Sequence, residues 1–233
     1  EILFDKNEDD KPNANIIKNP NYTEEISKGS FQNGENQIDH FDEKGRLISR
    51  ETELKNGGRK IDYFDANGRL TKTEIRKLNG DIQIDHFDKN GKLTKREKIS
   101  QNGDNQIIEY FDKNGKMTKR ESKNQNGDTQ IDYFDENGKM TKRESKNQNG
   151  DIQIDYFDEN GKLSKRETTN EDGQHQVEYF DEDGKLTKKE TILDNGDIQV
   201  DYYDENGRLI QTKLKKKKKG KNGKFHYEYD ESN

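Results

Sequence analysis

The chain has 233 residues, of which only 24% are apolar while 39% are charged, too little apolar material for a conventional two-layer domain. Its 43 basic and 49 acidic residues are interleaved and leave a net charge of −6, so opposite charges can pair across strands and order is favoured over disorder. Because the chain has no cysteine, disulfides, thiolate nucleophiles and cysteine-ligated zinc are excluded.

Residues 1–35 lack the periodicity of the rest of the chain, and we expect an atypical N-terminal cap or a flexible lead there. The sequence opens at Glu1 rather than at Met, as a processed product would, so a signal peptide is presumed to have been removed. No apolar run approaches the ~20 residues that span a bilayer. These features predict an extracellular or cell-surface protein.

Residues 36–212 form an array of repeats, each marked by an aromatic residue followed by Asp. The step between neighbouring anchors is 23 residues, except for one step of 24, which indicates a β-bulge within residues 105–108. The anchors are Phe41, Phe64, Phe87, Phe111, Phe134, Phe157, Phe180 and Tyr203. This regularity predicts eight copies of one supersecondary unit.

Each repeat contains two alternating segments separated by turn residues, as in residues 128–150. In the Asp-Glu-Asn-Gly turn, we expect a type I turn followed by Gly138 in the left-handed conformation. This geometry places Asp135 opposite Lys139. The same count sets three further pairs across the hairpin: Phe134 opposite Met140, Tyr133 opposite Thr141, and Asp132 opposite Lys142.

The connection to the preceding repeat is expected to be a four-residue loop, 124–127, because this length keeps the faces of successive repeats aligned. It predicts three pairs between repeats: Phe134 opposite Met117, Tyr133 opposite Thr118, and Asp132 opposite Lys119.

One face of the sheet should therefore carry a Phe and Leu/Met stripe beside an Asp/Lys stripe, and the other face Tyr and Thr beside Ile and Arg. Apolar side chains are dense on neither face. The predicted fold is all-β: an elongated antiparallel β-hairpin repeat, meander or solenoid-like, in a largely single-layer twisted sheet of about eight 23-residue repeats.

Residues 213–224 hold eight lysines and no acid, and we expect a Lys-rich linker there, followed by a degenerate C-terminal strand or cap over 225–233. A solvated linker that discourages strand addition is one interpretation of the run; contact with anionic lipid, glycan or nucleic acid is the other. Because a dedicated nucleic-acid protein would interleave Arg and aromatic residues, no specific nucleic-acid partner is expected. The run centres on Lys215, Lys216, Lys217, Lys218 and Lys219.

The segment from Tyr63 to Thr71, Tyr-Phe-Asp-Ala-Asn-Gly-Arg-Leu-Thr, resembles the YD repeat of Rhs-type proteins. The 23-residue hairpin is also similar to MORN-variant repeats and to secreted repeat families of mollicutes that have no assigned function. The resemblance covers residues 37–211 and implies a repeat architecture, which serves in scaffolds, cell-surface fibres and toxin shells alike. The Gly-x-Gly of ordinary MORN repeats is missing, and no catalytic residue is carried over.

Residues that could carry catalysis or bind a metal have simpler explanations in this sequence. His40 and His86 occupy a repeat position filled elsewhere by Tyr, and no His has a partner at ligand spacing. The Asp-x-Asn-Gly turns resemble the start of a calcium loop but lack its Glu-terminated twelve residues. Carboxylates repeated eightfold opposite lysines indicate cross-strand pairs rather than a hydrolase pair. We expect no enzyme, no cofactor and no metal.

The function expected from these features is that of a bacterial repeat scaffold that binds another protein or its own copies, as an adhesin, effector or filament subunit. Carbohydrate or envelope-polymer binding on the Tyr/Thr face is the alternative, and an antitoxin-like or membrane-organising role inside the cell comes third. The expected binding residues lie in the surface stripes: Phe111, Phe134, Phe157, Tyr133, Tyr156 and Tyr179.

Overall fold

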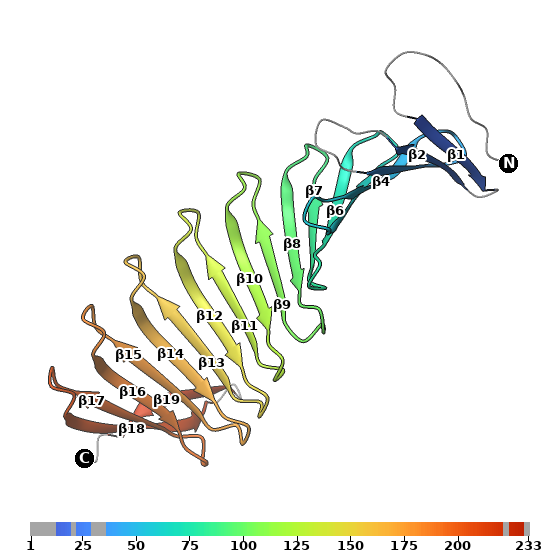
Figure 1. Cartoon of the computed structure of the whole chain (residues 1–233). Helices are drawn as coiled ribbons and strands as arrows, with labels where there is room; N and C mark the ends of the chain where they lie inside the picture. Colours follow the sequence, from blue (N-terminus) through green and yellow to red (C-terminus); the bar gives the residue numbers. More distant parts are fainter. Residues whose placement is uncertain (1–12, 20–21, 29–35, 221–223, 231–233) are drawn as a thin grey trace. The chain divides into compact units, whose positions relative to one another are not determined.

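The computed structural model describes residues 13–19, 22–28, 36–220 and 224–230, with side chains from residue 36 onward. Every regular element in this part of the chain is a β-strand (Figure 1), and the strands divide between two units, 1–117 and 118–233. No helix long and apolar enough to cross a membrane occurs among the residues described. The predicted all-β class is confirmed.

In unit 1 each strand pairs antiparallel with the next strand along the chain, which is the topology of a meander. The strands are β1 (Asn13–Asn19), β2 (Tyr22–Lys28), β3 (Gln37–Phe41), β4 (Leu47–Glu53), β5 (Arg59–Phe64), β6 (Leu70–Arg76), β7 (Ile82–Phe87), β8 (Leu93–Ile99) and β9 (Gln106–Phe111).

Unit 2 repeats the same topology, beginning in β10 and ending at the edge strand β19. Its strands are β10 (Met117–Lys123), β11 (Thr129–Phe134), β12 (Met140–Lys146), β13 (Ile152–Phe157), β14 (Leu163–Thr169), β15 (His175–Phe180), β16 (Leu186–Ile192), β17 (Ile198–Tyr203), β18 (Leu209–Lys219) and β19 (Phe225–Tyr229).

Both kinds of loop have the same backbone geometry. In the first, Asp135 N donates to the Lys139 carbonyl at 2.9 Å and Gly138 N donates to the Asp135 carbonyl at 3.0 Å, with φ of +80° at Gly138. Asp135 Oδ1 also accepts the backbone N–H groups of Asn137 and Lys139, at 2.8 and 2.9 Å. This is the predicted type I turn with a left-handed glycine.

The second loop was expected to have four residues, and this expectation is wrong. Asn124 N donates to the Asp128 carbonyl at 3.0 Å and Gly127 N to the Asn124 carbonyl at 3.0 Å, so Asn124 repeats the role of Asp135. Its side-chain oxygen accepts the N–H groups of Asn126 and Asp128. The last paired residues are Lys123 and Thr129, so five residues, 124–128, separate the strands, one more than expected.

A β-bulge compensates for that extra residue in the hairpins from β3–β4 to β7–β8 and from β11–β12 to β17–β18. Phe134 lies opposite Met140 as predicted, but Tyr133 lies opposite Lys142 rather than Thr141, and Asp132 lies opposite Arg143 rather than Lys142. The ladder skips Thr141, whose hydroxyl donates to the Tyr133 carbonyl at 3.4 Å. Loop and bulge each shift the register by one residue, so the 23-residue period is preserved.

The predicted pairs between repeats are also shifted by one residue. Tyr133 faces Lys119 instead of Thr118, and Asp132 faces Arg120 instead of Lys119. The face that carries Asp132 and Phe134, called the aspartate face below, therefore holds Asp and Arg rather than Asp and Lys. The opposite face, called the tyrosine face, carries Tyr beside Lys and Ile beside Glu, not Tyr beside Thr and Ile beside Arg.

Most of the buried side chains among the described residues are carboxylates rather than hydrocarbons. Val200 is the one buried apolar residue there, whereas Asp62, Asp85, Glu109, Asp132, Asp155 and Asp201, all at the same repeat position, are buried. Cross-strand neighbours place Arg120, Asp132, Arg143, Asp155 and Arg166 in one continuous row of unit 2. A row of alternating charge thus takes the place of a hydrophobic core.

The ion pairs of this row have the geometry of charge-assisted hydrogen bonds. Arg143 Nε donates to Asp132 Oδ1 at 2.7 Å, and Arg96 bonds both oxygens of Asp85 at 2.7 and 2.8 Å. Donation to Asp132 raises the pKa of Arg143 above its ordinary value. The buried acids are therefore neutralised within the sheet, which a buried carboxylate requires.

One position of the row shows how a missing arginine is replaced. Thr73 occupies an arginine position, is buried, and donates to Asp62 Oδ1 at 2.6 Å. In the same repeat Lys60 replaces the usual glutamine and its Nζ lies 2.7 Å from Asp62 Oδ2. The positive charge that is missing at Thr73 on β6 is thus supplied by Lys60 on β5.

The 24-residue step is not the predicted β-bulge at 105–108. β9 pairs with β8 without interruption from Gln106 onward, and Ser100 N donates to the Asn105 carbonyl at 3.0 Å, where the other loops close on the fourth residue. The extra residue lies in the loop because a loop accommodates an insertion without disturbing the ladder.

Strands occur at both ends of the array, within the segments expected as a cap or flexible lead and as a linker. β1 and β2 lie within the segment expected as a cap or a flexible lead, and β2 pairs with β3; the other residues of 1–35 lie outside the described residues. The lysine run expected as a linker is strand through Lys219, paired with β17 and β19. The expected closing strand is β19.

Candidate binding surfaces

The tyrosine face of unit 2 carries one row in which tyrosine and lysine alternate from strand to strand. Its members lie at a constant repeat position and are half-buried. In order across β10–β17 they are Lys119, Tyr133, Lys142, Tyr156, Lys165, Tyr179, Lys188 and Tyr202. The expected binding residues Tyr133, Tyr156 and Tyr179 are thus brought onto one face, two strands apart.

Each tyrosine ring has a lysine ammonium beside it. Lys188 Nζ lies 3.7 Å from the centroid of the Tyr179 ring, and Lys165 Nζ lies 4.1 Å from that of Tyr156. Such cation–π contacts contribute about 0.5–1 kcal/mol at exposed sites. The lysines hold the rings in place and cover part of their faces.

The lysines are held in turn by glutamates two residues further along each strand. Lys119 Nζ lies 2.7 Å from Glu121 Oε1, and Lys165 Nζ lies 2.7 Å from Glu167 Oε1. The hydrogen bond to Glu167 raises the pKa of Lys165 above its ordinary value. The tyrosine face is therefore a regular surface of half-buried aromatic rings between balanced charges.

The phenylalanine stripe lies on the opposite face, as the sequence predicts. Phe134 and Phe157 are half-buried in unit 2, and Phe111 is half-buried in unit 1. Phe134 lies opposite its predicted partner Met140, and Phe157 lies opposite Leu163. The six expected binding residues therefore do not form one site; whether they bind a partner stays a prediction.

Unit 2 has a cavity of about 1060 Å³ that was not predicted from the sequence. One cross-strand row supplies five of its lining residues, with hydroxyl and amide side chains in alternation: Ser145, Gln153, Thr168, Gln176 and Thr191. The loops 147–151, 170–174 and 193–195 contribute further lining residues. The Gln/Thr alternation was visible in the sequence, but nothing in the linear pattern showed that these side chains line a cavity.

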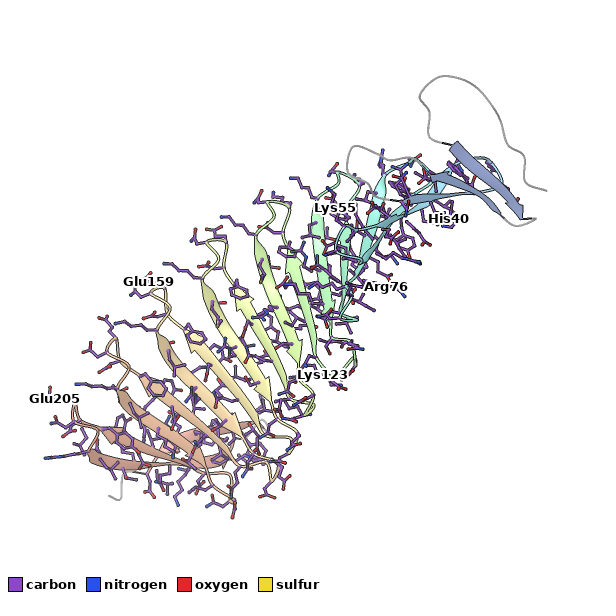
Figure 2. The ribbon with its side chains drawn as sticks, in the orientation of Figure 1. His40, Lys55, Arg76, Lys123, Glu159 and Glu205 are labelled. Carbon is purple, nitrogen blue, oxygen red and sulfur yellow. The ribbon has the colours of Figure 1, made fainter. Side chains whose placement is uncertain are left out.

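The two edges formed by the loops carry different side chains. In unit 2, Figure 2 shows Glu159 and Glu205 on the edge formed by the Asp-Glu-Asn-Gly loops and Lys123 on the opposite edge. The turn aspartates engage backbone N–H groups, which lower the pKa of Asp112. These contacts explain the turn aspartates without an ion.

The histidines and acids are distributed along the sheet rather than gathered. His86 Nε2 lies 2.8 Å from Glu97 Oε1 and His175 Nδ1 lies 2.9 Å from Thr169 Oγ1. In the part of the chain that is described, no three His, Asp or Glu side chains are close enough to hold a metal ion. The expected absence of metal and cofactor stays a prediction.

No protein-family model matches the sequence, and no curated protein matches it. Among solved structures, one chain of the "Crystal Structure of TcdB2-TccC3-Cdc42" aligns with a TM-score of 0.22 at 14% sequence identity. The alignment covers 94% of this chain and 15% of that chain. A likeness at this TM-score indicates neither a family nor a function for this chain.

Proposed function

We propose that this chain is a non-enzymatic repeat scaffold, secreted by a bacterium or displayed on its surface, that binds another protein or further copies of itself through the tyrosine face. The supporting observation is the tyrosine–lysine row, in which Tyr133, Tyr156 and Tyr179 have the same lysine neighbours on both sides. Aromatic anchors inside a polar, charged rim are the composition of protein interfaces.

The disposition of the acids supports a non-catalytic role. A general acid or base needs a carboxyl or imidazole group that can exchange its proton with substrate. The buried aspartates instead accept hydrogen bonds from arginine, as Asp155 does from Arg166 at 2.7 and 3.1 Å, and the turn aspartates accept backbone N–H groups. Adhesin, effector and filament subunit are all roles that such a scaffold can fill.

The test replaces Tyr133, Tyr156 and Tyr179 together by Ser, with the triple Tyr→Phe variant as the matched control. Self-association is measured by sedimentation velocity over a range of protein concentrations, and binding to surface-labelled proteins is measured with the immobilised chain. We expect the Ser variant to lose association and the Phe variant to retain most of it, because the ring provides most of the contact area. Circular dichroism checks that the strands persist.

If the Ser variant keeps both self-association and partner binding at the level of the original chain, the tyrosine face is not the binding surface. Loss of the strand signal in the Ser variant is not expected, because each cross-strand pair contributes only about 0.2–1 kcal/mol. The Phe variant retains the rings, so it separates a binding defect from a folding defect.

We propose carbohydrate binding as the second candidate, on a surface other than the tyrosine face. On the tyrosine face, the rings that a sugar would stack on are half-buried and have lysine ammonium groups 3.7–4.1 Å from their centroids, as at Tyr156 and Tyr179. The cavity lined by hydroxyl and amide side chains instead offers neutral donors and acceptors, as a glycan site does. Glycan-array binding that is lost in Thr168→Val and retained in Thr187→Val, outside the cavity, would favour this candidate over the first.

A further inference from the structure

The hairpin formed by β18 and β19 departs from the charge balance of the other strands in unit 2. At the repeat position filled by Glu121, Glu144, Glu167 and Glu190, the strand β18 has Lys213. From there on, every second residue of β18 on the tyrosine face is a lysine: Lys213, Lys215, Lys217 and Lys219. Along the other strands lysine and glutamate alternate at these positions, as in Lys119 and Glu121. Along β18 the same face carries positive charge only.

The strand β19 places aromatic side chains directly beside these lysines. Tyr229 pairs with Lys215, Tyr227 with Lys217, and Phe225 with Lys219. The interleaving of basic and aromatic residues that the linear sequence lacks is thus created by strand pairing. The seven side chains, Lys213, Lys215, Lys217, Lys219, Phe225, Tyr227 and Tyr229, are called the lysine–aromatic platform below.

The aromatic residues of the platform are far more exposed than those of the array. Phe225 is 60% exposed, Tyr227 44% and Tyr229 49%, whereas the tyrosines of the array are half-buried. The exposure has a simple cause, because among the described residues β19 pairs with β18 and packs against no other strand. Large exposed aromatic groups at a sheet edge indicate an interaction surface.

The lysines of the platform are also largely uncompensated. Lys215 Nζ lies 3.1 Å from Glu190 Oε1, but Lys213, Lys217 and Lys219 make no ion pair with an acid in the described part of the chain. Lys217 Nζ lies 4.5 Å from the centroid of the Phe225 ring. Apart from Glu190, the acids that pair with β18 engage the other face of the strand, where Lys218 binds Glu228 and Lys216 lies 3.6 Å from Asp197.

We propose that the lysine–aromatic platform binds single-stranded nucleic acid without sequence preference. Its two rows run side by side about 4.8 Å apart, and members of each row repeat every ~6.8 Å along the strands. A single strand has the same two-row character, with charged phosphates on one side and flat bases on the other. Lysines attract the phosphates and the exposed rings stack on bases, which is how sequence-independent single-strand binders work.

Other polyanions lack one half of this match. Polyphosphate and acidic glycans present charge without aromatic bases, so they use the lysine row alone. An anionic membrane presents charge over a plane and gives no reason for two separate rows. The proposal is independent of the function proposed for the tyrosine row, because the two use different residues.

The experiment measures binding of fluorescein-labelled dT20 to the full chain by fluorescence anisotropy at 50 and 200 mM salt. Three to four phosphate contacts give a slope of about −2 to −3 in a plot of log affinity against log salt concentration. Affinity should therefore fall about 20- to 50-fold over this range. Replacing Phe225 and Tyr227 together by Leu should lower affinity at least about 10-fold at either salt concentration, because stacking is lost.

The matched control exploits the alternation of the strand. Lys217→Gln with Lys219→Gln removes two charges from the platform, and Lys216→Gln with Lys218→Gln removes two charges from the opposite face of the same strand. We expect the first pair to weaken binding and to reduce the magnitude of the salt slope by about 1.4, and the second pair to change both by much less. Both pairs alter net charge equally and leave β19 intact.

Three results would overturn the proposal. The first is no binding of dT20 at 50 mM salt, and the second is equal effects of the two lysine pairs. The third is binding that the Leu variant leaves unchanged and that inorganic polyphosphate of equal charge competes fully, which would mean a plain polyanion site. Binding to phosphatidylserine vesicles without binding to dT20 would identify a membrane surface instead.

Discussion

Removing the charge of one buried aspartate tests whether the Asp–Arg row replaces a hydrophobic core. The side chain of Asp132 is 4% exposed and accepts from Arg143 Nε at 2.7 Å, while Gln130 Nε2 lies 3.1 Å from each carboxylate oxygen. In Asp132→Asn the amide oxygen can still accept from one of these donors. Rotation of the Gln130 amide can restore the other contact, so the main loss is the charged bond to Arg143.

The expected destabilisation follows from the burial of the two partners. A hydrogen bond to a charged group contributes about 1.5–3 kcal/mol, and removing one member of a fully buried ion pair costs about 3–5 kcal/mol. Because the Arg143 side chain is 34% exposed, water compensates part of its loss. We therefore expect Asp132→Asn to cost about 2 kcal/mol, which lowers the melting temperature by roughly 4–8 °C for a chain of this size.

Thermal melts followed by circular dichroism provide the measurement. Glu159→Gln, on an exposed loop (Figure 2), removes the same charge and should change stability by less than about 0.5 kcal/mol. A double-mutant cycle with Arg143→Gln should give a coupling energy above about 0.5 kcal/mol. Equal melting temperatures for Asp132→Asn and Glu159→Gln, or no coupling with Arg143, would refute the idea that the row carries the stability of the sheet.

Three further predictions concern the turns and the charged rows. Gly138→Ala should cost about 1 kcal/mol through the backbone alone, since φ is +80° and an added methyl meets no atom within 4 Å; an unchanged melt would show that the turn tolerates any residue. The backbone N–H groups of the turns lower the pKa values of Asp42 and Asp65. The contribution of these two aspartates to folding stability is therefore complete above their unfolded-state pKa and is lost as pH falls through the lower folded-state pKa. Hydrogen bonds to glutamate raise the pKa values of Lys142 and Lys165, so their contribution is complete below the unfolded-state pKa and is lost as pH rises through the folded-state pKa; melting temperatures that do not decline at both extremes would contradict this. Chelators should leave the melt unchanged because the turn aspartates already accept backbone N–H groups, and a rise above about 10 °C on adding calcium would contradict it.

The sequence predicts the strands, both glycine turns and the Phe134–Met140 pair because each depends on local chemistry that repeats. The bulge at Thr141 was not predicted, since a bulge and a longer loop cancel in the 23-residue period. One signal was available: Thr71, Thr94 and Thr187 occupy the same position as Thr141, and each donates to the carbonyl of the residue across the ladder.

Some features of the binding surfaces follow from local sequence, and others depend on how the strands pair. The tyrosine row was predicted as a stripe because it follows from period and alternation alone. The arginine partners of the buried aspartates required the correct register, and a shift of one residue exchanged Arg for Lys. The aromatic neighbours of the lysine run depend on how β18 and β19 pair, which no stretch of sequence shows by itself.

The cancelling loop and bulge make the repeat a unit that can be copied or deleted without correction elsewhere. Tyr133 and Tyr156 are 23 residues apart and both lie opposite Lys142, one on each side of it. Removing 23 consecutive residues therefore joins strands whose charges still match. Gene-level slippage by whole repeats would therefore change the number of binding units while leaving each surviving unit unaltered. A single-residue deletion within a strand would instead reverse its faces and set carboxylates against hydrocarbon.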